Sequence, residues 1–577
     1  MGFYWKHPIK EDDMFYKEIQ FGLNYSRKNL RYDGWGALGQ DFFLKDHVNE
    51  IIDIIKKEWS LSFLPETPGI QIEDIKIRAS RLTSELEKNL IKIVGAENLK
   101  LDNYERIFHS VGKSYYDVLR LRFNLLTEYT DGVIYPSSDL EIEDILKFCK
   151  LKNIAVIPFG GGSSVVGGVE ALKNKGQKAI LTLDLTKMNA LRDIDMNSST
   201  ATFQTGIYGP DLENILNEKG YTLGHFPQSF EYSTLGGWIA ARGSGQQSGK
   251  YGKIEKMIVS MKVITTEGSI HTFKLPPNSM GPDLNNIFTG SEGVLGVITE
   301  ATMKIHKLPE SRKYFAIVFP SFENGINFIK EVHRRSIKVS MARLSDEDET
   351  FIFAGLNSIG KPITIPRKFK KYLTEKVLSW NNIGSRRSAM IAGVESSPSE
   401  IDSIMDSLKQ IIVANQGFYG GTSPGKNWVR SRFNMPYLRN HFMERGVGVD
   451  TLETSITYDR ILGLHENVNL SIRKVQPVCN TLCHISHSYP EGASLYFTII
   501  FPLDTKNPIE QWKNIKNAAS DAIFEHGGSI SHHHGIGVDH KEWYIKIIGE
   551  NARKGLLQLK KSWDPKGILN PGKLFSE

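Results

Sequence analysis

Residues 156–168, VIPFGGGSSVVGG, form the segment from which the architecture of this chain follows. A run of strand-forming residues ends directly in three glycines and two serines, and two more glycines follow. Glycine tolerates positive φ and lets a backbone approach a ligand closely, and successive N–H groups in such a turn form a concave set of donors for phosphate oxygens. The segment therefore indicates a loop that binds a nucleotide pyrophosphate, with a Gly/Ser-rich surface loop as the alternative.

Two common glycine-rich loops do not match this segment. A Walker loop requires Gly-Lys-Ser/Thr, whereas Val165 and Val166 stand where the lysine is needed. A Rossmann loop opens a helix. Here the chain continues from Gly168 through residues 170–175 into another strand-like run, 179–183, with no amphipathic helix between. We therefore expect a nucleotide-binding domain of another kind.

Composition sets broad limits on the protein. A chain of 577 residues exceeds what one core usually organises, so two or more domains are expected. A hydrophobic content of 40% and a charged content of 24% are ordinary for a globular protein. The net charge of +6 is small and not gathered into a basic block, which gives no argument for a nucleic-acid partner. Cys149, Cys479 and Cys483 cannot form a disulfide framework and fit a reducing compartment.

Targeting is not readable from the chain. No apolar run reaches the ~18–20 residues of a membrane span, and the first residues, MGFYWKHPIK, lack the apolar core of a signal peptide. The last residues, 574–577, are not a Ser-Lys-Leu peroxisomal signal.

Hydrophobic periodicity predicts an α+β protein. A helical N-terminal region includes a helix over 47–59, and Ser138 with Glu141 indicates a capping box for a helix that ends near Asn153. That helix carries an apolar stripe of Leu140, Ile145, Leu146 and Cys149. The predicted strands of this part are 154–157, 180–183, 200–205 and a pair, 258–265 with 269–273, with a helix over 210–218.

A second series of elements begins near residue 313. The predicted strands are 314–319, 338–344, 389–395, 495–501 and 529–533, and the predicted helices are 324–335, 401–415 and one through Trp512 to Phe524. This pattern indicates an antiparallel sheet with helices on one face. We therefore divide the chain into a helical region 1–120, a nucleotide-binding domain 121–308, a second domain 309–550, and a segment 551–577 that returns to the nucleotide-binding domain.

Three further glycine-rich segments lie in the nucleotide-binding domain, at 227–237, 241–245 and 290–296. Four such loops favour one extended ligand, and a flavin dinucleotide presents a ring, a ribityl chain, a pyrophosphate and an adenosine in turn. The order GGGSS, STLGG and SEGVLGVITEA resembles the vanillyl-alcohol-oxidase (PCMH-type) family of FAD-binding domains over residues 124–308. The resemblance implies a two-subdomain FAD-binding domain with an α+β cap domain.

The same resemblance implies the residues that contact FAD. They are Pro158, Phe159, Gly160, Gly161, Gly162, Ser163, Ser164, Gln228, Ser229, Phe230, Glu231, Tyr232, Ser233, Thr234, Ala241, Arg242, Gly243, Ser244, Glu292, Gly293, Val294, Leu295, Gly296, Val297 and Ile298. No histidine or cysteine stands in these loops to tether the flavin, and the nearby His225 is better explained as structural. We expect non-covalent FAD.

Three adjacent histidines, His532, His533 and His534, give the strongest signal of the second domain. On a strand the first and third would share one face and the second would oppose them, so one metal ion could not easily bind all three, and we predict no metal site. Imidazoles titrate near neutrality, which favours proton transfer and hydrogen bonding to an anionic substrate.

Other polar residues of this domain are less distinctive. Tyr496 lies in a run of strand formers and, from the sequence alone, is an ordinary core tyrosine. Arg343 lies in an otherwise apolar strand, where a guanidinium needs an anion. Arg439 is one of three candidate arginines, with Arg430 and Arg432.

Together these segments resemble the alkyldihydroxyacetonephosphate synthase family. The residues that carry the resemblance include Asp33-Gly-Trp-Gly, Met280-Gly-Pro-Asp, Arg343-Leu, Pro436-Tyr-Leu-Arg439, Leu452-Glu-Thr-Ser455, residues 483–496 and the three histidines. It implies that Tyr496 donates or accepts a proton, that the histidines and Arg343 are needed for activity, and that Arg439 binds substrate.

The reaction implied by the resemblance replaces the acyl group of acyl-dihydroxyacetone phosphate with a fatty alcohol, without net redox, through an adduct at flavin N5. It further implies ether-lipid biosynthesis, a peripheral membrane surface, a homodimer and a peroxisomal location, with the cytoplasm as the alternative.

Two other functions stay open at this point. Asn570-Pro-Gly-Lys-Leu-Phe departs from the synthase pattern and is similar to FAD-dependent D-2-hydroxyacid dehydrogenases, which pass electrons to an acceptor. A flavin-binding protein without catalysis is the third possibility, and the histidine triplet argues against it.

Overall fold

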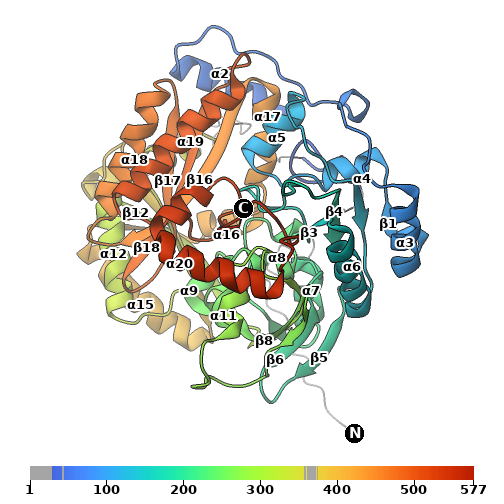
Figure 1. Ribbon diagram of the computed structural model, residues 1–577. Helices are drawn as coiled ribbons and strands as arrows, with labels where there is room; N and C mark the ends of the chain where they lie inside the picture. The colour runs from blue at the N-terminus through green and yellow to red at the C-terminus, as the bar shows by residue number, and fades with distance from the viewer. Residues whose placement is uncertain are drawn as a thin grey trace.

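A computed structural model of the protein describes residues 27, 29–41, 45–356, 359, 372 and 375–576 (Figure 1). Residues 1–26 of the predicted helical N-terminal region therefore lie outside the described residues, as does Glu577. The regular elements of the described part of that region are helices, apart from one short strand, and irregular segments separate them. Its helices are α2 (Val48–Glu58), α3 (Ser84–Val94), α4 (Asn103–Phe108) and α5 (Tyr115–Arg122), with 3₁₀ turns at Lys45–His47, Ile72–Asp74 and Ala96–Asn98.

A small mixed sheet carries the glycine-rich segment. Its strands, in spatial order, are β1 (Leu99–Lys100), β2 (Gly132–Ile134), β4 (Ile180–Asp184) and β3 (Ala155–Phe159), and β2, β4 and β3 run parallel. The predicted strands at 154–157 and 180–183 are confirmed within two residues. The chain from Gly160 to Gly168, the glycine loop, leaves the end of β3 without forming a helix, as predicted.

Helix α6 (Asp139–Lys152) connects β2 to β3 and begins and ends where the sequence predicts. The Ser138 side chain accepts a hydrogen bond from the Glu141 N–H, and Asn153 ends the helix in a left-handed conformation. Two details were wrong. The Glu141 carboxylate accepts from the N–H of Ser137 instead of closing a capping box, and Leu140 is 72% exposed because Ile142 occupies the buried face.

A five-stranded antiparallel sheet completes the nucleotide-binding half. In spatial order it contains β5 (Leu191–Asp195), β6 (Thr200–Gln204), β10 (Val297–Lys304), β8 (Ile258–Thr265) and β9 (Gly268–His271), and the predicted pairing of β8 with β9 is confirmed. Strand β7 (Tyr221–Thr222) pairs separately with β11 (His306–Lys307). The helices of this part are α7 (Gly209–Asn217), α8 (Leu235–Ala240), α9 (Ser248–Tyr251), α10 (Ile254–Met257) and α11 (Leu284–Phe288).

The second half is built on a seven-stranded antiparallel sheet, which we call the cap sheet. Its spatial order is β15 (Phe418–Gly421), β12 (Ser311–Phe319), β14 (Ser388–Ser396), β13 (Met341–Ser345), β17 (Asn480–Ser488), β18 (Gly492–Pro502) and β16 (Val447–Thr457). This confirms the antiparallel sheet predicted from the second series of elements.

One face of the cap sheet is apolar and covered by helices (Figure 1). Alternate residues of its strands, such as Leu495 and Phe497, form one continuous core with the apolar sides of these helices. The covering helices are α12 (Phe322–Arg334), α15 (Pro398–Ala414), α18 (Ile461–Val475) and α19 (Pro508–Glu525). The opposite face contacts the nucleotide-binding half, where Glu395 of β14 accepts hydrogen bonds from Gln247 and Tyr251.

The remaining helices are α13 (Glu347–Leu356), α16 (Ser423–Ser431), α17 (Met435–Glu444) and α20 (Lys541–Trp563), the last interrupted at Gly549. After α20 the chain returns to the glycine-rich segment. The N–H of Val156 donates to Ile568 O at 2.8 Å, and the N–H of Asn570 donates to Val156 O at 2.9 Å. The end of the chain thus lies against β3.

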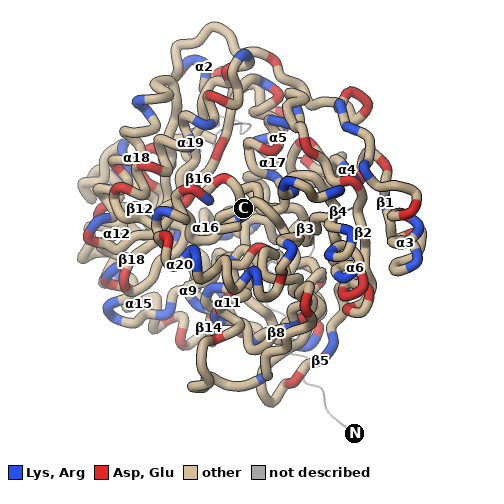
Figure 2. Tube along the Cα trace, viewed as in Figure 1, with Lys and Arg blue, Asp and Glu red and all other residues tan. Residues whose placement is uncertain are grey.

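Basic and acidic residues are interspersed along the chain in the view of Figure 2. None of the helices in the described part of the chain combines the length and the apolar character needed to cross a membrane.

Candidate active site

A row of three polar residues crosses the cap sheet on the face opposite the helices. Strand β18 lies between β16 and β17, and Tyr496 is directly paired with Glu453 on one side and with His484 on the other. Because side chains alternate along a strand, and Leu495 and Phe497 enter the helix-covered core, the Tyr496 side chain points toward the nucleotide-binding half. Strand register therefore assembles residues that are far apart in the sequence.

Tyr496 is enclosed by imidazole rings. Its ring stacks on His484 with centroids 4.9 Å apart and on His533 at 6.0 Å, and it meets the edge of His534 at 5.5 Å. Burial raises the pKa of the Tyr496 hydroxyl to about 12. The hydroxyl is therefore protonated at neutral pH and can donate a proton or a hydrogen bond.

The three adjacent histidines lie in a loop, so the predicted strand at 529–533 is wrong. Strand-like pairing stops at Ser529, whose N–H donates to Ser455 O. The following N–H groups of His532, His533 and His534 all donate to the carboxylate of Glu453, at 2.7, 3.0 and 2.9 Å. A buried carboxylate thus takes the place of a neighbouring strand, and the imidazoles do not alternate between two faces.

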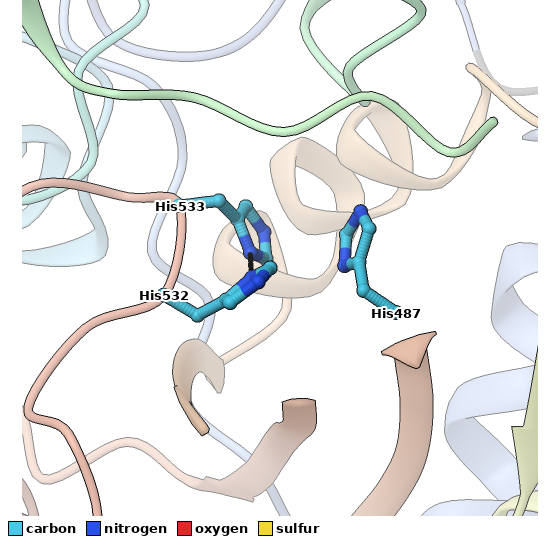
Figure 3. Close-up of side chains that lie close together, drawn as sticks. All are labelled: His487, His532 and His533. Carbon is cyan, nitrogen blue, oxygen red and sulfur yellow. Dashed lines mark hydrogen bonds between the residues drawn. The ribbon is translucent and has the colours of Figure 1, made fainter. Parts of the chain in front are cut away.

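The loop brings two of the three histidines to a residue that the sequence did not indicate. Figure 3 shows His532 and His533 facing His487 of β17, and their ring centroids lie 4.9 and 5.1 Å from that of His487. The Nδ1 atoms of His532 and His533 are 3.1 Å apart. One nitrogen from each ring lies within 4.8 Å of the others, so the group could hold a metal ion. The argument from strand alternation no longer applies, and the absence of a metal stays a prediction.

Burial keeps these histidines neutral. It lowers the pKa of His533 to about 3 and lowers the pKa values of His532 and His487 well below the ordinary value. Hydrogen bonds occupy several ring nitrogens: the Tyr489 hydroxyl is 2.7 Å from His532 Nε2, and His487 Nε2 is 3.1 Å from Gly245 O. Neutral imidazoles beside a protonated tyrosine can accept and return protons.

Arg343 lies on the same face of the cap sheet, but its anion is supplied by the protein. Its guanidinium donates to Glu349 Oε1 at 2.9 Å and lies 3.1 Å from Nδ1 of His484. Burial alone would raise the pKa of Glu349, but Arg343 and His484 hold it at about 2. The expectation that this arginine needs an anion is met by Glu349, and Arg343 also orients His484.

Arg439 approaches Tyr496 from α17. Its Nη2 donates to the backbone oxygen of Lys113 at 2.7 Å, and burial lowers the pKa of its guanidinium. Its Nε atom is buried and has no hydrogen-bond partner within the described residues. The competing Arg432 likewise has a buried Nε without a hydrogen-bond partner within the described residues, but its guanidinium packs over the rings of Phe226 and Phe433, away from Tyr496. Arg439 is thus the arginine with an unused donor near Tyr496, which suits an anionic ligand group.

The glycine loop has the free donors that a pyrophosphate needs. Among the described residues, the backbone N–H groups from Gly160 to Val165 donate to no protein atom. The loop also packs against the second predicted FAD segment, since a Cβ on Gly160 would lie 2.2 Å from Thr234 Oγ1, and one on Gly161 would lie 1.8 Å from Tyr232 O. Only glycine allows this approach, so the residues present fit a bound FAD.

Several of the other predicted FAD contacts use their side chains within the protein. Six of these side chains belong to hydrophobic cores; they are Phe230, Tyr232, Val294, Leu295, Val297 and Ile298. The carboxylate of Glu292 is used elsewhere, because it accepts from the N–H groups of Ile536 at 2.5 Å and Gly537 at 2.7 Å. The FAD contacts themselves stay a prediction.

His225 lies beside these loops, packed 4.8 Å from Trp238. It is fully buried, and neither ring nitrogen has a hydrogen-bond partner within the described residues. Burial lowers its pKa to about 3.

Comparison with known proteins identifies both halves. Residues 130–274 match the family model of an FAD binding domain, and residues 308–574 match that of the C-terminal domain of FAD linked oxidases. The fold and the site thus define a two-domain FAD-dependent enzyme. The chain is 35% identical to an alkyldihydroxyacetonephosphate synthase of Trypanosoma brucei brucei, over 92% of this chain and 86% of that one. It is 34% identical to the synthase of Dictyostelium discoideum, over 90% and 87%.

Comparison with solved structures leads to the same family. An alkyldihydroxyacetonephosphate synthase matches with a TM-score of 0.80 and 30% identity, over 99% of this chain and 100% of that one. The chain therefore belongs to the alkyldihydroxyacetonephosphate synthase family. A D-lactate dehydrogenase (cytochrome) of Saccharomyces cerevisiae is 24% identical over 77% of this chain and 72% of that one, so the dehydrogenase alternative fits only more distant relatives.

The C-terminal departure that suggested a dehydrogenase has a structural role. Asn570 donates from its amide to Gly168 O and Glu292 O, at 3.0 and 2.5 Å, and the buried Lys573 donates to Glu170 O. These contacts hold the end of the chain on the glycine loop and do not involve Tyr496 or the histidines. The C-terminal segment therefore contributes to the structure of the FAD-binding half and gives no information about the substrate.

Proposed function

We propose that this enzyme replaces the acyl chain of acyl-dihydroxyacetone phosphate with a fatty alcohol, which yields an alkyl ether and a free fatty acid for ether-lipid synthesis. The observation that carries the proposal is the partly buried Tyr496, in contact with the rings of His484, His533 and His534, in a chain similar to the synthases over nearly its whole length. These groups suit a reaction in which protons move but no oxidant is consumed.

Residues on and around the cap sheet have separate chemical roles. The alcohol must lose a proton as it attacks, and a neutral imidazole of the triplet can accept it. Tyr496 holds its proton on the hydroxyl oxygen and can donate it to the departing carboxylate. Arg439 binds the substrate phosphate through its unused buried donor, and Arg343 holds His484 against the tyrosine. The bound FAD supplies a ring system that can take up and return an electron pair.

One assay tests this function against its rival. Purified protein is mixed anaerobically with acyl-dihydroxyacetone phosphate and a labelled fatty alcohol. Label in an alkali-stable ether phosphate, together with release of fatty acid, is the expected result. The proposal fails if no such product forms and D-lactate or D-2-hydroxyglutarate instead reduces the flavin.

We also propose non-covalent FAD, a homodimer and association with the surface of a membrane, in the peroxisome, with the cytoplasm as the alternative. Fatty substrates reside in membranes, and exposed aromatic side chains such as Phe351 (68%) and Trp380 (78%) are suited to a lipid surface. Acid precipitation should release FAD into the supernatant, sedimentation should give twice the chain mass, and the protein should float with vesicles. A tethered flavin, a monomer or unbound vesicles would contradict these points separately.

A further inference from the structure

We propose that Glu453 is a positioning residue, whose carboxylate fixes the histidine loop, residues 531–537, over Tyr496. Only the activity readout of this inference rests on the proposed function. Glu453 lies in the segment Leu452-Glu-Thr-Ser455 and is neither a substrate-binding nor an FAD-binding residue.

The side chain of Glu453 is fully buried and its hydrogen-bonding capacity is used by one loop. Oε1 accepts from the Ser531 hydroxyl at 2.7 Å and from the N–H groups of His533 and His534 at 3.0 and 2.9 Å. Oε2 accepts from the N–H of His532 at 2.7 Å. The carboxylate thus accepts four hydrogen bonds from the histidine loop, three at Oε1 and one at Oε2. The carboxylate therefore determines the path of the histidine backbone.

The backbone N–H groups of the three histidines depend on Glu453, although other parts of the loop have further hydrogen bonds. Among the described residues, the N–H groups of His532, His533 and His534 have no acceptor besides Glu453. The nucleotide-binding half also contacts the loop. Lys253 donates to His532 O at 2.9 Å, and the Glu292 carboxylate accepts from the Ile536 N–H at 2.5 Å. The loop is thus held between carboxylates of the two halves, and Glu453 is the one beneath the imidazoles.

The position of Glu453 on β16 links the loop to the tyrosine. Glu453 and Tyr496 are cross-strand neighbours, so one rigid sheet sets the places of both the tyrosine and the histidine backbone. A shift of the loop would separate the imidazoles from Tyr496 even if each side chain were intact, and reactions of this kind are sensitive to displacements of about 1 Å.

Glu453 also places a negative charge beside the imidazoles. Its oxygens lie 3.5 Å from Nδ1 of His533 and 3.8 Å from Nδ1 of His534. This charge favours the protonated imidazole and so eases proton uptake during the reaction. The titratable groups that face His533 from all sides are Glu453, His534, His532, His487, His484, Tyr496 and Lys253.

The chain offers a matched control in Glu395. This carboxylate is likewise buried on the same face of the cap sheet, and it accepts from Gln247 and Tyr251 of the nucleotide-binding half and from Tyr314 of the cap sheet. It makes no contact with the histidine loop among the described residues. A loss that arises merely from removing the charge of a buried carboxylate on this face of the cap sheet should therefore appear in both E395Q and E453Q.

The test compares E453Q, E453D and E395Q as FAD-loaded proteins. Hydrogen exchange measured by mass spectrometry should rise in the peptide spanning 529–537 in E453Q and remain unchanged there in E395Q. In the ether-forming assay, kcat of E453Q should fall about 100-fold with KM changed less than about threefold. E453D, which keeps the charge, should recover part of kcat. The acid limb of the kcat profile should move to lower pH in E453Q only, because a lost negative charge lowers imidazole pKa values.

Two results would overturn the inference. One is unchanged exchange at 529–537 in folded, FAD-containing E453Q. The other is an equal loss of kcat in E395Q and E453Q without a change in the pH profile. If the wild type forms no ether product, the proposed function fails, while the exchange experiment still decides the role of Glu453.

Discussion

The nucleotide-binding half and the cap sheet assemble their functional groups in different ways. The first uses backbone donors that are consecutive in the sequence, from Gly160 to Val165. The second uses side chains from separate strands and a loop, such as Arg343, Tyr496 and His533, which only the register of the sheet brings together. A change in the first half should therefore alter FAD binding, whereas a change in the second should alter turnover with FAD retained.

The largest expected effect is that of Tyr496→Phe. Removal of one hydroxyl takes away the proton donor but keeps the ring stacked on His484, so we expect a loss of kcat of about 100- to 10,000-fold. Turnover and the flavin absorbance spectrum are measured on the same sample. If the variant loses FAD as well, Tyr496 is a structural residue and the contrast between the halves breaks down.

Gly161→Ala tests the other side of the comparison. The added Cβ would lie 1.8 Å from Tyr232 O, so the glycine loop must move away from residues 232–234. Overpacking of about 1–3 kcal/mol corresponds to an affinity for FAD that is about 5- to 150-fold weaker, measured by fluorescence titration. Gly555→Ala, where no atom lies within 4 Å, is the control and should bind FAD as the wild type does. Equal affinities for both variants would show that the loop does not hold the cofactor.

The smallest expected effect concerns the contact between the halves. Burial raises the pKa of Glu292 to about 7. The N–H groups of Ile536 and Gly537 favour the charged carboxylate and offset part of the effect of burial. A carboxyl whose pKa is raised by folding binds its proton more tightly in the folded state. Its contribution to the stability of the fold is complete below the pKa of the unfolded chain and is lost as the pH rises through 7. Glu292→Gln should remove about 1–3 kcal/mol of that pH dependence, measured by thermal unfolding between pH 4.5 and 8.

The control for this prediction is Glu218→Gln, a change at an exposed carboxylate of the same half. It should leave the slope of unfolding temperature against pH unchanged. If the unfolding temperatures of E292Q and the wild type fall by the same amount as the pH rises, the Glu292 carboxyl does not titrate in this range.

The sequence predicts the nucleotide-binding half well because its signals are local. Glycine content, the end of β3 and the cap at Ser138 depend on neighbours within a few residues, and the structure confirms the strands and α6. The predictions of a capping box and of a buried Leu140 were wrong because both features depend on how α6 packs against the sheet.

The site of the cap sheet was only partly predictable. Tyr496 and the histidine triplet were identified, but His484, His487 and Glu453 were missed because sequence shows neither which strands are neighbours nor their register. The histidines were predicted on a strand because a distant carboxylate that replaces strand partners leaves no local signal. Glu349 was missed for the same reason, because its contact with Arg343 joins a strand to the helix that follows it.

The return of the chain end to β3 has a consequence for synthesis on the ribosome. Ile568 and Leu569 complete the core around β3, and Leu574 and Phe575 complete the core of the five-stranded sheet. A nascent chain that has emerged only as far as the cap sheet lacks these side chains. The cofactor-binding half, although it is made first, should finish folding last, and tags or truncations at the C-terminus should impair flavin loading rather than the cap.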